Sequence, residues 1–184
     1  MMKYCSACGA GISYRIPDGD DRERAVCDDC DTIHYVNPRI IVGCLPEYQG
    51  RLLLCLRSIE PRKGFWTLPA GFMENGETTE QGAARETWEE ARARVEDLSL
   101  YRVYDVPYIN QVYMFYRCRL VDGSHNAGPE SLDTRLFAPD EIPWDDLAFP
   151  SVYRALASYL RDRESENAFP VQVETILRRR DAGG

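Results

Sequence analysis

The chain has 184 residues, of which 44% are apolar, and a formal net charge of −8. This length supports one core of ordinary size plus a small appendage, and the apolar content argues against wholesale disorder. The sequence has neither a membrane-spanning apolar stretch nor the apolar segment of a signal peptide near its start, so we expect a cytoplasmic protein that meets no membrane. The acidic charge disfavours sequence-independent nucleic-acid binding, which needs clustered Lys and Arg.

The N-terminal segment carries two Cys-x-x-Cys pairs, Cys5 with Cys8 and Cys27 with Cys30. Four thiolates at this spacing are typical of a closed, tetrahedral and therefore structural Zn²⁺ site. The segment holds few apolar side chains, so a bound ion would supply folding energy that a core cannot. We expect a small zinc ribbon with one Zn²⁺ over residues 1–37; two redox pairs or four free thiols are the alternatives.

Charge limits what this ribbon can bind. It has four basic and seven acidic residues, a net charge of −3, which argues against a phosphate-binding surface. His34 follows the second pair and is a spare ligand at best; we favour a surface or packing role. Cys44, Cys55 and Cys118 lie in apolar runs and are predicted to be buried strand residues.

The rest of the chain predicts an alternation of strands and helices. Apolar runs at 40–46 and 51–57 predict a hairpin that turns at Gly50. Further strands are expected at 66–71, 100–106, 111–120 and 134–138, and helices at 78–92 and 151–163. Residues 169–180 form either a strand or a docked tail. This order predicts an α+β fold, an α/β/α sandwich on a mixed sheet over residues 38–165, with a C-terminal tail at 166–184.

The first predicted helix places Glu86, Glu89 and Glu90 on one face, across an arc of about 100°. The opposite side, which we expect to face the core, holds Ala84, Thr87, Trp88 and Ala91. Carboxylates at these spacings repel one another, and a divalent cation with a preference for oxygen ligands would relieve the repulsion. From helix geometry alone, a solvated acidic face and a metal site both remain open.

The wider spacing decides between them. Gly71 is followed after five residues by Glu77, after seven more by Arg85-Glu86, and after two more by Glu89-Glu90. This pattern resembles the Nudix box, and residues 66–71 resemble its usual lead-in. The resemblance implies the Nudix fold and a hydrolase of diphosphate bonds that depends on two or three Mg²⁺ or Mn²⁺ ions.

The resemblance also implies roles for individual residues. Glu86, Glu89 and Glu90 should hold the catalytic ions, together with the backbone carbonyl of Gly71 or Ala70. Glu86 and Arg85 count as catalytic, and Arg85 should pair with Glu77 to lock the loop onto the helix. Glu130, in a later loop, is the candidate general base or extra metal ligand; a solvent-facing loop residue is the alternative.

Two positions depart from the box. Thr87 stands where an aliphatic residue is usual, and Arg92 stands where Gly is usual. A Gly there would adopt the left-handed conformation that ends the helix, so Arg92 leaves the end of the helix open by about one turn.

The substrate is less defined. A zinc ribbon before a Nudix domain resembles the NADH pyrophosphatase branch, but the SQPWPF signature of that branch is absent. Segments such as NPRIIVGCL and GPESLDTRLFA resemble a zinc-ribbon Nudix branch that hydrolyses FAD and ADP-ribose. We therefore favour ADP-ribose or FAD as the substrate and AMP as one product, with NADH or NAD as the alternative.

Several side chains are candidates for contacts with such a nucleotide. Arg57 and Arg62 could meet phosphates, with surface exposure as the alternative. Four aromatic residues could stack on adenine or flavin, with packing as the alternative; they are Trp66, Tyr104, Tyr108 and Tyr113.

Two other classes of function remain to be weighed. One is a non-catalytic ADP-ribose-binding sensor, which the intact set of box carboxylates disfavours. The other is a zinc-ribbon adaptor for a protein or RNA, whose RNA form the acidic ribbon disfavours. The family resemblance is compatible with a homodimer, although no residue pattern predicts one.

Overall fold

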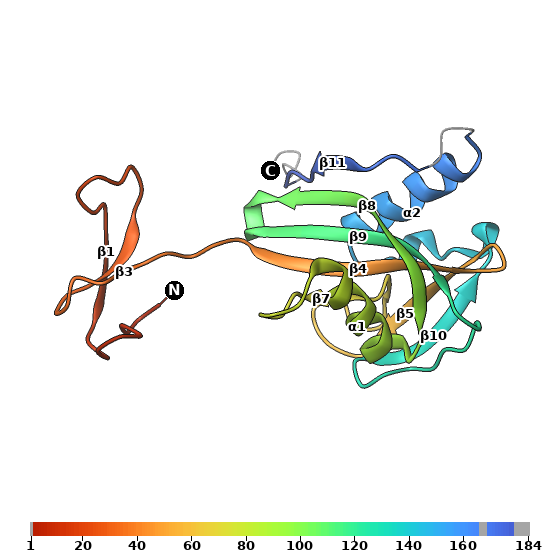
Figure 1. Cartoon of the computed structure of the whole chain (residues 1–184), viewed down its shortest axis with the longest axis horizontal. Helices are drawn as coiled ribbons and strands as arrows, with labels where there is room; N and C mark the ends of the chain where they lie inside the picture. The colour runs from red at the N-terminus through yellow and green to blue at the C-terminus, as the bar shows by residue number, and fades with distance from the viewer. Residues whose placement is uncertain (1, 166–168, 179–184) are drawn as a thin grey trace, which may run out of the picture. The chain divides into compact units, whose positions relative to one another are not determined.

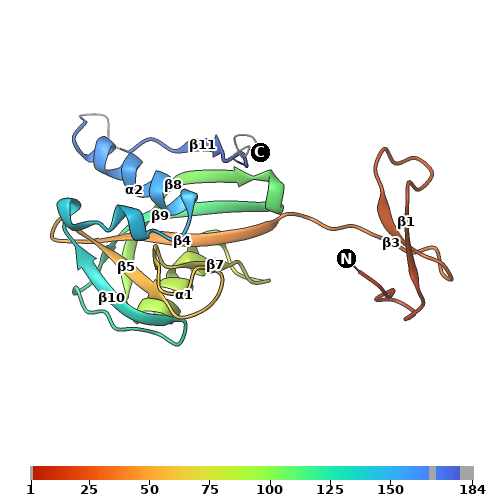
Figure 2. The ribbon, with the colours of Figure 1, turned by 180° about the vertical axis from the view of Figure 1, so that it is seen from behind.

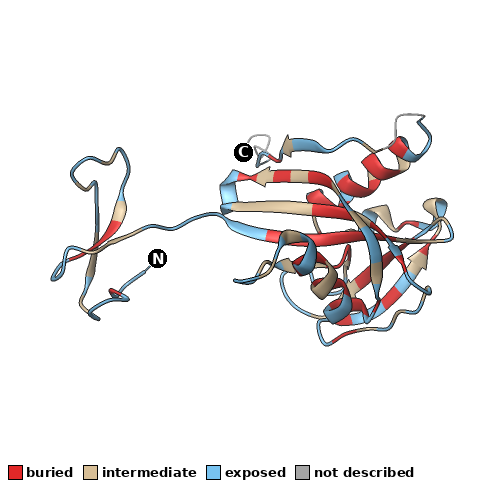
Figure 3. Cartoon of the chain, viewed as in Figure 1, coloured by how far each residue is buried: buried red, intermediate tan, exposed pale blue. Residues whose placement is uncertain are grey.

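The computed structural model describes residues 2–165 and 169–178. The chain divides into two compact units, Met1–Asn37 and Pro38–Gly184. The first unit is a three-stranded antiparallel sheet in the order β1-β2-β3, with β1 (Ile12–Arg15), β2 (Arg24–Cys27) and β3 (Ile33–His34). Among its described residues only Cys5, Ala25, Val26 and Cys27 are buried, and most of the remainder is exposed (Figure 3). This unit therefore has almost no apolar core.

The second unit is built on an eight-stranded sheet (Figure 1). Its strands are β4 (Arg39–Tyr48), β5 (Arg51–Arg57), β6 (Trp66–Thr67), β7 (Ala70–Phe72), β8 (Val95–Val106), β9 (Gln111–Leu120), β10 (Ser131–Phe137) and β11 (Gln172–Thr175). The order is β10-β5-β4-β9-β8-β11, with β6 beside β5 and β7 beside β4. The pairs β4–β9 and β8–β11 are parallel and the other pairs antiparallel. The prediction of a mixed sheet is confirmed.

Helices cover both faces of this sheet (Figure 2). Leu52 and Leu54 share one buried cluster with Leu156 of α2 (Pro150–Arg163), whereas Leu53 shares another with Ala91 of α1 (Thr79–Ala91). Side chains of a strand alternate between faces, so a continuous apolar run such as 52–55 is buried on both. This is the predicted α/β/α sandwich. Three short 3₁₀ helices complete the unit: η1 (Pro107–Ile109), η2 (Pro139–Glu141) and η3 (Trp144–Asp146). None of the helices that the structure describes is long and apolar enough to span a membrane.

Most predicted elements lie close to their expected places. The β4–β5 hairpin turns at Gln49 and Gly50, whose φ angles of 51° and 78° suit a two-residue hairpin turn. Segment 66–71 is not one strand but two short ones, β6 and β7, separated at Leu68 and Pro69. The three cysteines outside the ribbon are at most 5% exposed, as predicted; they are Cys44, Cys55 and Cys118.

The described part of the C-terminal tail joins the sheet. Strand β11 pairs with β8, so of the two forms predicted for this segment, a strand or a docked tail, the strand is the one observed. The fully buried Arg102 of β8 fastens this region, because its guanidinium donates to Asp162 at 2.5 Å and to the carbonyl of Pro170 at 2.6 Å. Residues 166–168 and 179–184 of the predicted tail lie outside the described residues.

Candidate functional site

The acidic helix begins at a strong local start signal. The Thr78 hydroxyl accepts a hydrogen bond from the N–H of Gln81 at 3.1 Å, and the Gln81 side chain accepts one from the N–H of Thr78 at 2.9 Å. This reciprocal capping box starts α1 directly after Glu77. The helix therefore emerges from the preceding loop in a defined direction.

Arg85 joins that loop to the helix. Its Nε and Nη2 atoms both donate to the Glu77 carboxylate at 2.9 Å, and Nη2 also donates to the Phe72 carbonyl at 3.1 Å. This two-pronged pair lowers the pKa of Glu77 to about 2. The remaining Nη1 atom donates to Glu86 at 2.7 Å and to Glu89 at 2.9 Å. One guanidinium thus orients three carboxylates.

Two of the box carboxylates lie against the backbone of β7. A Cβ atom at Gly71 would stand 2.3 Å from Oε2 of Glu86, so only a residue without a side chain leaves room for this carboxylate. The N–H of Ala70 donates to Oε2 of Glu90 at 3.3 Å. The loop and the helix therefore bring the carboxylates and the 70–71 backbone together.

Burial gives these carboxylates unusual electrostatics. Glu86 and Glu90 are only 9% and 7% exposed. Burial raises the pKa of both groups, and Glu90, which also feels the charge of Glu86, reaches about 8. The charge of Glu130 raises both pKa values further, so its carboxylate belongs to the same electrostatic environment. Excess negative charge in one buried place is the condition under which a divalent cation is held.

Glu130 reaches this place because its loop docks on the end of α1. The N–H of Gly128 donates to the carbonyl of Glu90 at 2.9 Å, and that of Asn126 donates to the carbonyl of Ala91 at 2.8 Å. A Cβ atom at Gly128 would stand 1.7 Å from the carbonyl oxygen of Glu89. The loop can approach so closely only because this residue is Gly. Glu130 itself is exposed at the edge of the site.

The buried face of α1 differs from the predicted one. Thr87 and Ala91 are fully buried, as predicted, but Trp88 is 47% exposed. Of the three carboxylates predicted for the open face, Glu89 is exposed whereas Glu86 and Glu90 are buried, because β7 and the docked loop cover that side. Thr87 is fully buried, and its hydroxyl donates to the carbonyl of Ala83 at 2.8 Å, which explains how a polar residue replaces an aliphatic one. Arg92 ends the helix in the left-handed conformation, with φ of 49°.

The four ribbon cysteines converge on one point. All four Sγ atoms lie within 4.8 Å of one another, with Cys5 to Cys30 at 3.8 Å and Cys8 to Cys27 at 3.4 Å. A tetrahedron with Zn–S bonds of about 2.3 Å has edges of about 3.8 Å, so the donor set fits Zn²⁺.

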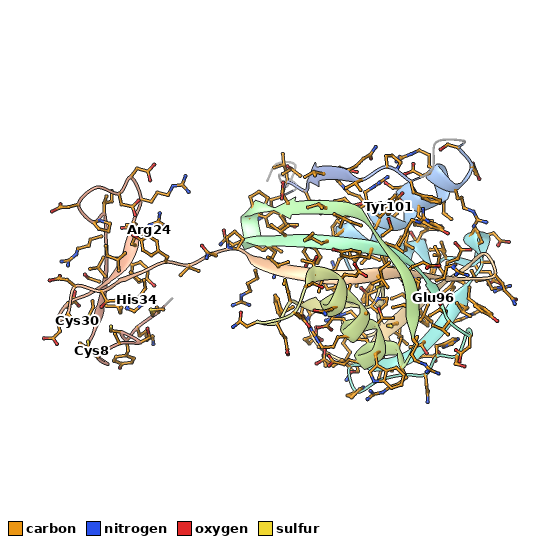
Figure 4. The ribbon with its side chains drawn as sticks, in the orientation of Figure 1. Cys8, Arg24, Cys30, His34, Glu96 and Tyr101 are labelled. Carbon is orange, nitrogen blue, oxygen red and sulfur yellow. The ribbon has the colours of Figure 1, made fainter. Side chains whose placement is uncertain are left out.

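His34 lies beside this cluster (Figure 4). Its Nε2 atom is 3.3 Å from Sγ of Cys5, so it contacts a predicted zinc ligand instead of facing solvent freely. The contact is a hydrogen bond to a sulfur that already belongs to a complete set of four thiols. His34 is therefore a neighbour that orients Cys5, a role that metal sites commonly give to residues around their ligands.

Comparison with known proteins agrees with this geometry. Residues 3–36 match the model of the Nudix N-terminal zinc ribbon, and residues 37–158 match that of the NUDIX domain. The chain belongs to the Nudix hydrolase family. A solved NUDIX hydrolase from Nitrosomonas europaea is 51% identical, with a TM-score of 0.91, over 95% of this chain and 99% of that one.

Curated relatives carry two kinds of name. The NAD-capped RNA hydrolase NudC of Photobacterium profundum is 30% identical over 74% of this chain and 50% of its own length. The ADP-ribose pyrophosphatase of Methanocaldococcus jannaschii is 29% identical over 59% of this chain and 67% of its own length. The chain spans about half to two thirds of the length of the first curated relatives it matches. Both names agree with the predicted class of nucleotide pyrophosphatase.

The predicted substrate residues of the Nudix unit have different surroundings. Arg57 ends β5 near the box, since its charge lowers the pKa of Glu90, and its guanidinium carbon is 5.1 Å from the ring centre of Phe149. Tyr108 is 48% exposed in η1. Trp66 packs edge-on against Phe137 at 4.8 Å, so packing accounts for much of its surface.

The other candidates also differ in burial and in their neighbours. Tyr104 is fully buried in the core, which leaves it no face for a substrate. Tyr113 is only partly buried. Burial raises its pKa, the charge of Tyr108 raises it further, and the charge of Arg57 lowers it. Arg62 lies over the ring of Phe65, with its guanidinium carbon 5.2 Å from the ring centre.

Three structural features were missed by sequence reasoning. Gly82 stands in the middle of α1, where a Cβ atom would be 2.6 Å from Glu77 and 2.8 Å from Val42, so it permits close packing on β4. A Gly inside a helix lowers stability by about 1 kcal/mol relative to Ala, so its presence there was a signal of close packing at this position. Gly128 had a weaker signal, the Gly-Pro pair before Glu130. Phe149 had none, because only the folded chain brings it to Arg57.

Proposed function

We propose that this Nudix chain hydrolyses the diphosphate bond of a nucleoside diphosphate linked to a second moiety, with ADP-ribose or FAD favoured and AMP as one product. The observation that supports this most is the packing of buried Glu86 and Glu90 against the 70–71 backbone, with Glu89 and Arg85 beside them. The NADH or NAD alternative gains weight from the NudC relatives, whose name specifies NAD-capped RNA.

The residues present fit a divalent cation. Burial raises the pKa of Glu86 and Glu90, which lie in one electrostatic environment, and carboxylate oxygens are the donors that Mg²⁺ and Mn²⁺ prefer. In this proposal Glu86, Glu89 and Glu90 hold the ions, with a backbone carbonyl of Gly71 or Ala70. When bound, such ions neutralise the diphosphate charge and lower the pKa of a coordinated water.

The chain's own groups have separate tasks. Arg85 holds the Glu86 and Glu89 carboxylates in place and ties them to Glu77. In this proposal Glu130 accepts the proton of the attacking water; its exposure and its electrostatic effect on Glu86 and Glu90 support this role. A carboxylate at the exposed rim can then pass that proton to solvent.

Substrate contacts are proposed on the α2 side of the site. Arg57 lies between the charge of Glu90 and the ring of Phe149, where a guanidinium can meet the substrate phosphates. Tyr108, half exposed, is placed to stack on the base, with Trp66 contributing its uncovered edge. These three positions would determine which nucleotide is accepted.

The test is hydrolysis with Mg²⁺ of a panel containing ADP-ribose, FAD, NADH and a 5′-NAD-capped RNA. The highest kcat/KM is expected for ADP-ribose or FAD. A preference for the capped RNA would replace the small-nucleotide assignment, and turnover of none of the panel would overturn the substrate proposal altogether.

The metal assignment needs its own variants. Glu89→Gln and Glu90→Gln should each lower kcat by about 10²-fold or more, since each removes one charged donor from the reacting centre. Glu80→Gln is the matched control, because Glu80 is an exposed residue of the same helix at a position that the box leaves unspecified. If both box variants keep full activity, the assignment of these residues as metal ligands fails.

A further inference from the structure

A cleft on the Nudix unit is lined by residues other than the box carboxylates. It has a volume of about 300 Å³ and is lined by Trp88, Arg92, Arg94, Asp122 and Ser124. At about 100° per residue, Trp88 projects from α1 some 160° around the helix from Glu90. None of the lining residues belongs to the proposed catalytic or substrate-binding set.

The backbone at Arg92 is the first sign that this cleft has a use. Arg92 takes a φ of 49°, a conformation that Gly adopts freely and that residues with a Cβ atom resist. The Nudix box that this chain resembles has Gly here. The Arg92 guanidinium lies over the Trp88 ring, with its carbon 5.8 Å from the ring centre. This C-cap conformation fixes where the Arg92 side chain leaves the end of α1.

The walls of the cleft are firmly placed. The N–H of Val121 donates to the carbonyl of Arg94 at 3.0 Å, and the N–H of Ser124 donates to the Asp122 carboxylate at 3.0 Å. The indole of Trp88 is 47% exposed, and Arg94 reaches Asp122 only at 3.8 Å, so both guanidinium groups have free donors. The cleft thus presents one half-exposed indole ring and two exposed cations beside a hydrogen-bonded backbone.

We propose that this cleft binds a free nucleoside monophosphate. The base would stack on the part of the Trp88 ring that the Arg92 guanidinium leaves open, and the phosphate dianion would sit between Arg92 and Arg94, the two groups suited to phosphate oxygens. Asp122 would accept hydrogen bonds from the ribose hydroxyls. A volume of about 300 Å³ is at the lower end for ligand sites, which suits one nucleotide. A nucleic-acid strand would need a longer positive groove than two arginines provide.

The test uses the full-length, zinc-loaded protein and AMP as the probe, without added Mg²⁺. The chain has three tryptophans, so the indole N–H signals in a ¹⁵N-correlation spectrum are few, and Trp88→Phe identifies the signal of Trp88. We expect that signal to shift saturably at submillimolar AMP. Arg92→Gly and Arg94→Gln should each weaken the affinity by about tenfold or more, and Arg154→Gln, an exposed arginine of α2, should leave it unchanged.

Folding does not confound this experiment. Arg92→Gly relieves the backbone, so this variant should be at least as stable as the parent, and weakened binding must then reflect the lost guanidinium. An unshifted Trp88 signal at millimolar AMP, or unchanged affinity in Arg92→Gly, would overturn the proposal and leave the two arginines as compensation for the helix dipole. A response to oligoadenylate but not to AMP would also overturn it. No turnover is measured, so the outcome is independent of the proposed hydrolysis.

Discussion

Replacing Gly71 with Ala tests how closely the box carboxylates are positioned. The added Cβ atom would stand 2.3 Å from Oε2 and 2.4 Å from Cδ and Oε1 of Glu86. Ordinary contacts between such atoms are no shorter than about 3.4 Å, so the carboxylate must move by about 1 Å. Arg85 holds this carboxylate at 2.7 Å, and the movement would break or rotate that hydrogen bond.

The expected consequence is a large loss of activity with a small loss of stability. The clashing atoms are the end of a side chain that can swing aside, so the free energy of unfolding should fall by only about 1 kcal/mol, at the low end for overpacking. A displacement of about 1 Å in a catalytic group can lower the rate by about 10²-fold. We therefore expect kcat to fall by about two orders of magnitude while the protein stays folded.

The assay is Mg²⁺-dependent release of AMP from ADP-ribose, with thermal unfolding measured on the same samples. Gly76→Ala is the matched control, since it lies in the same loop, has no atom within 4 Å of its added Cβ, and has a φ of 89°. It should lose stability through backbone strain and keep its activity. If Gly71→Ala retains activity within about threefold of the parent, the position of Glu86 does not limit catalysis and the reasoning fails.

Three further predictions concern stability. Arg92→Gly should raise the free energy of unfolding by about 0.5–1 kcal/mol, because Gly removes the left-handed strain; an unchanged or lower value in chemical denaturation would contradict it. The pKa of Glu77 is about 2 in the folded chain, against an ordinary 4.5. Its contribution to stability is therefore complete above pH 4.5 and is lost as the pH falls towards 2. Glu77→Gln should remove this part of the acid-unfolding curve, and a superimposable curve would argue against the ion pair. Elemental analysis should find about one Zn²⁺ per chain, and chelation should unfold residues 1–37 while the sheet keeps its circular dichroism; a ribbon that stays folded without metal would refute the zinc site.

Local patterns carried most of the correct predictions. The ends of β9, the position of α1 and the hairpin at Gly50 follow from apolar spacing and turn residues that act within a few positions. The same holds for the four ribbon cysteines. Each Cys-x-x-Cys spacing directs two thiols towards one point, and the two pairs meet there. Where several local signals agree, the chain has few alternatives.

The amino-acid sequence by itself therefore determined the family, the helix that carries Glu86, Glu89 and Glu90, and the zinc-type cysteine set, because each depends on short-range periodicity. Only the tertiary structure decided that the carboxylate side of that helix is buried together with the predicted Thr87 and Ala91. Strand β7 and the Gly128 loop, which are distant along the chain, cover the carboxylates and leave Trp88 exposed. The raised pKa values of Glu86 and Glu90 arise in the same way, since burial and neighbouring charge come from packing between distant segments.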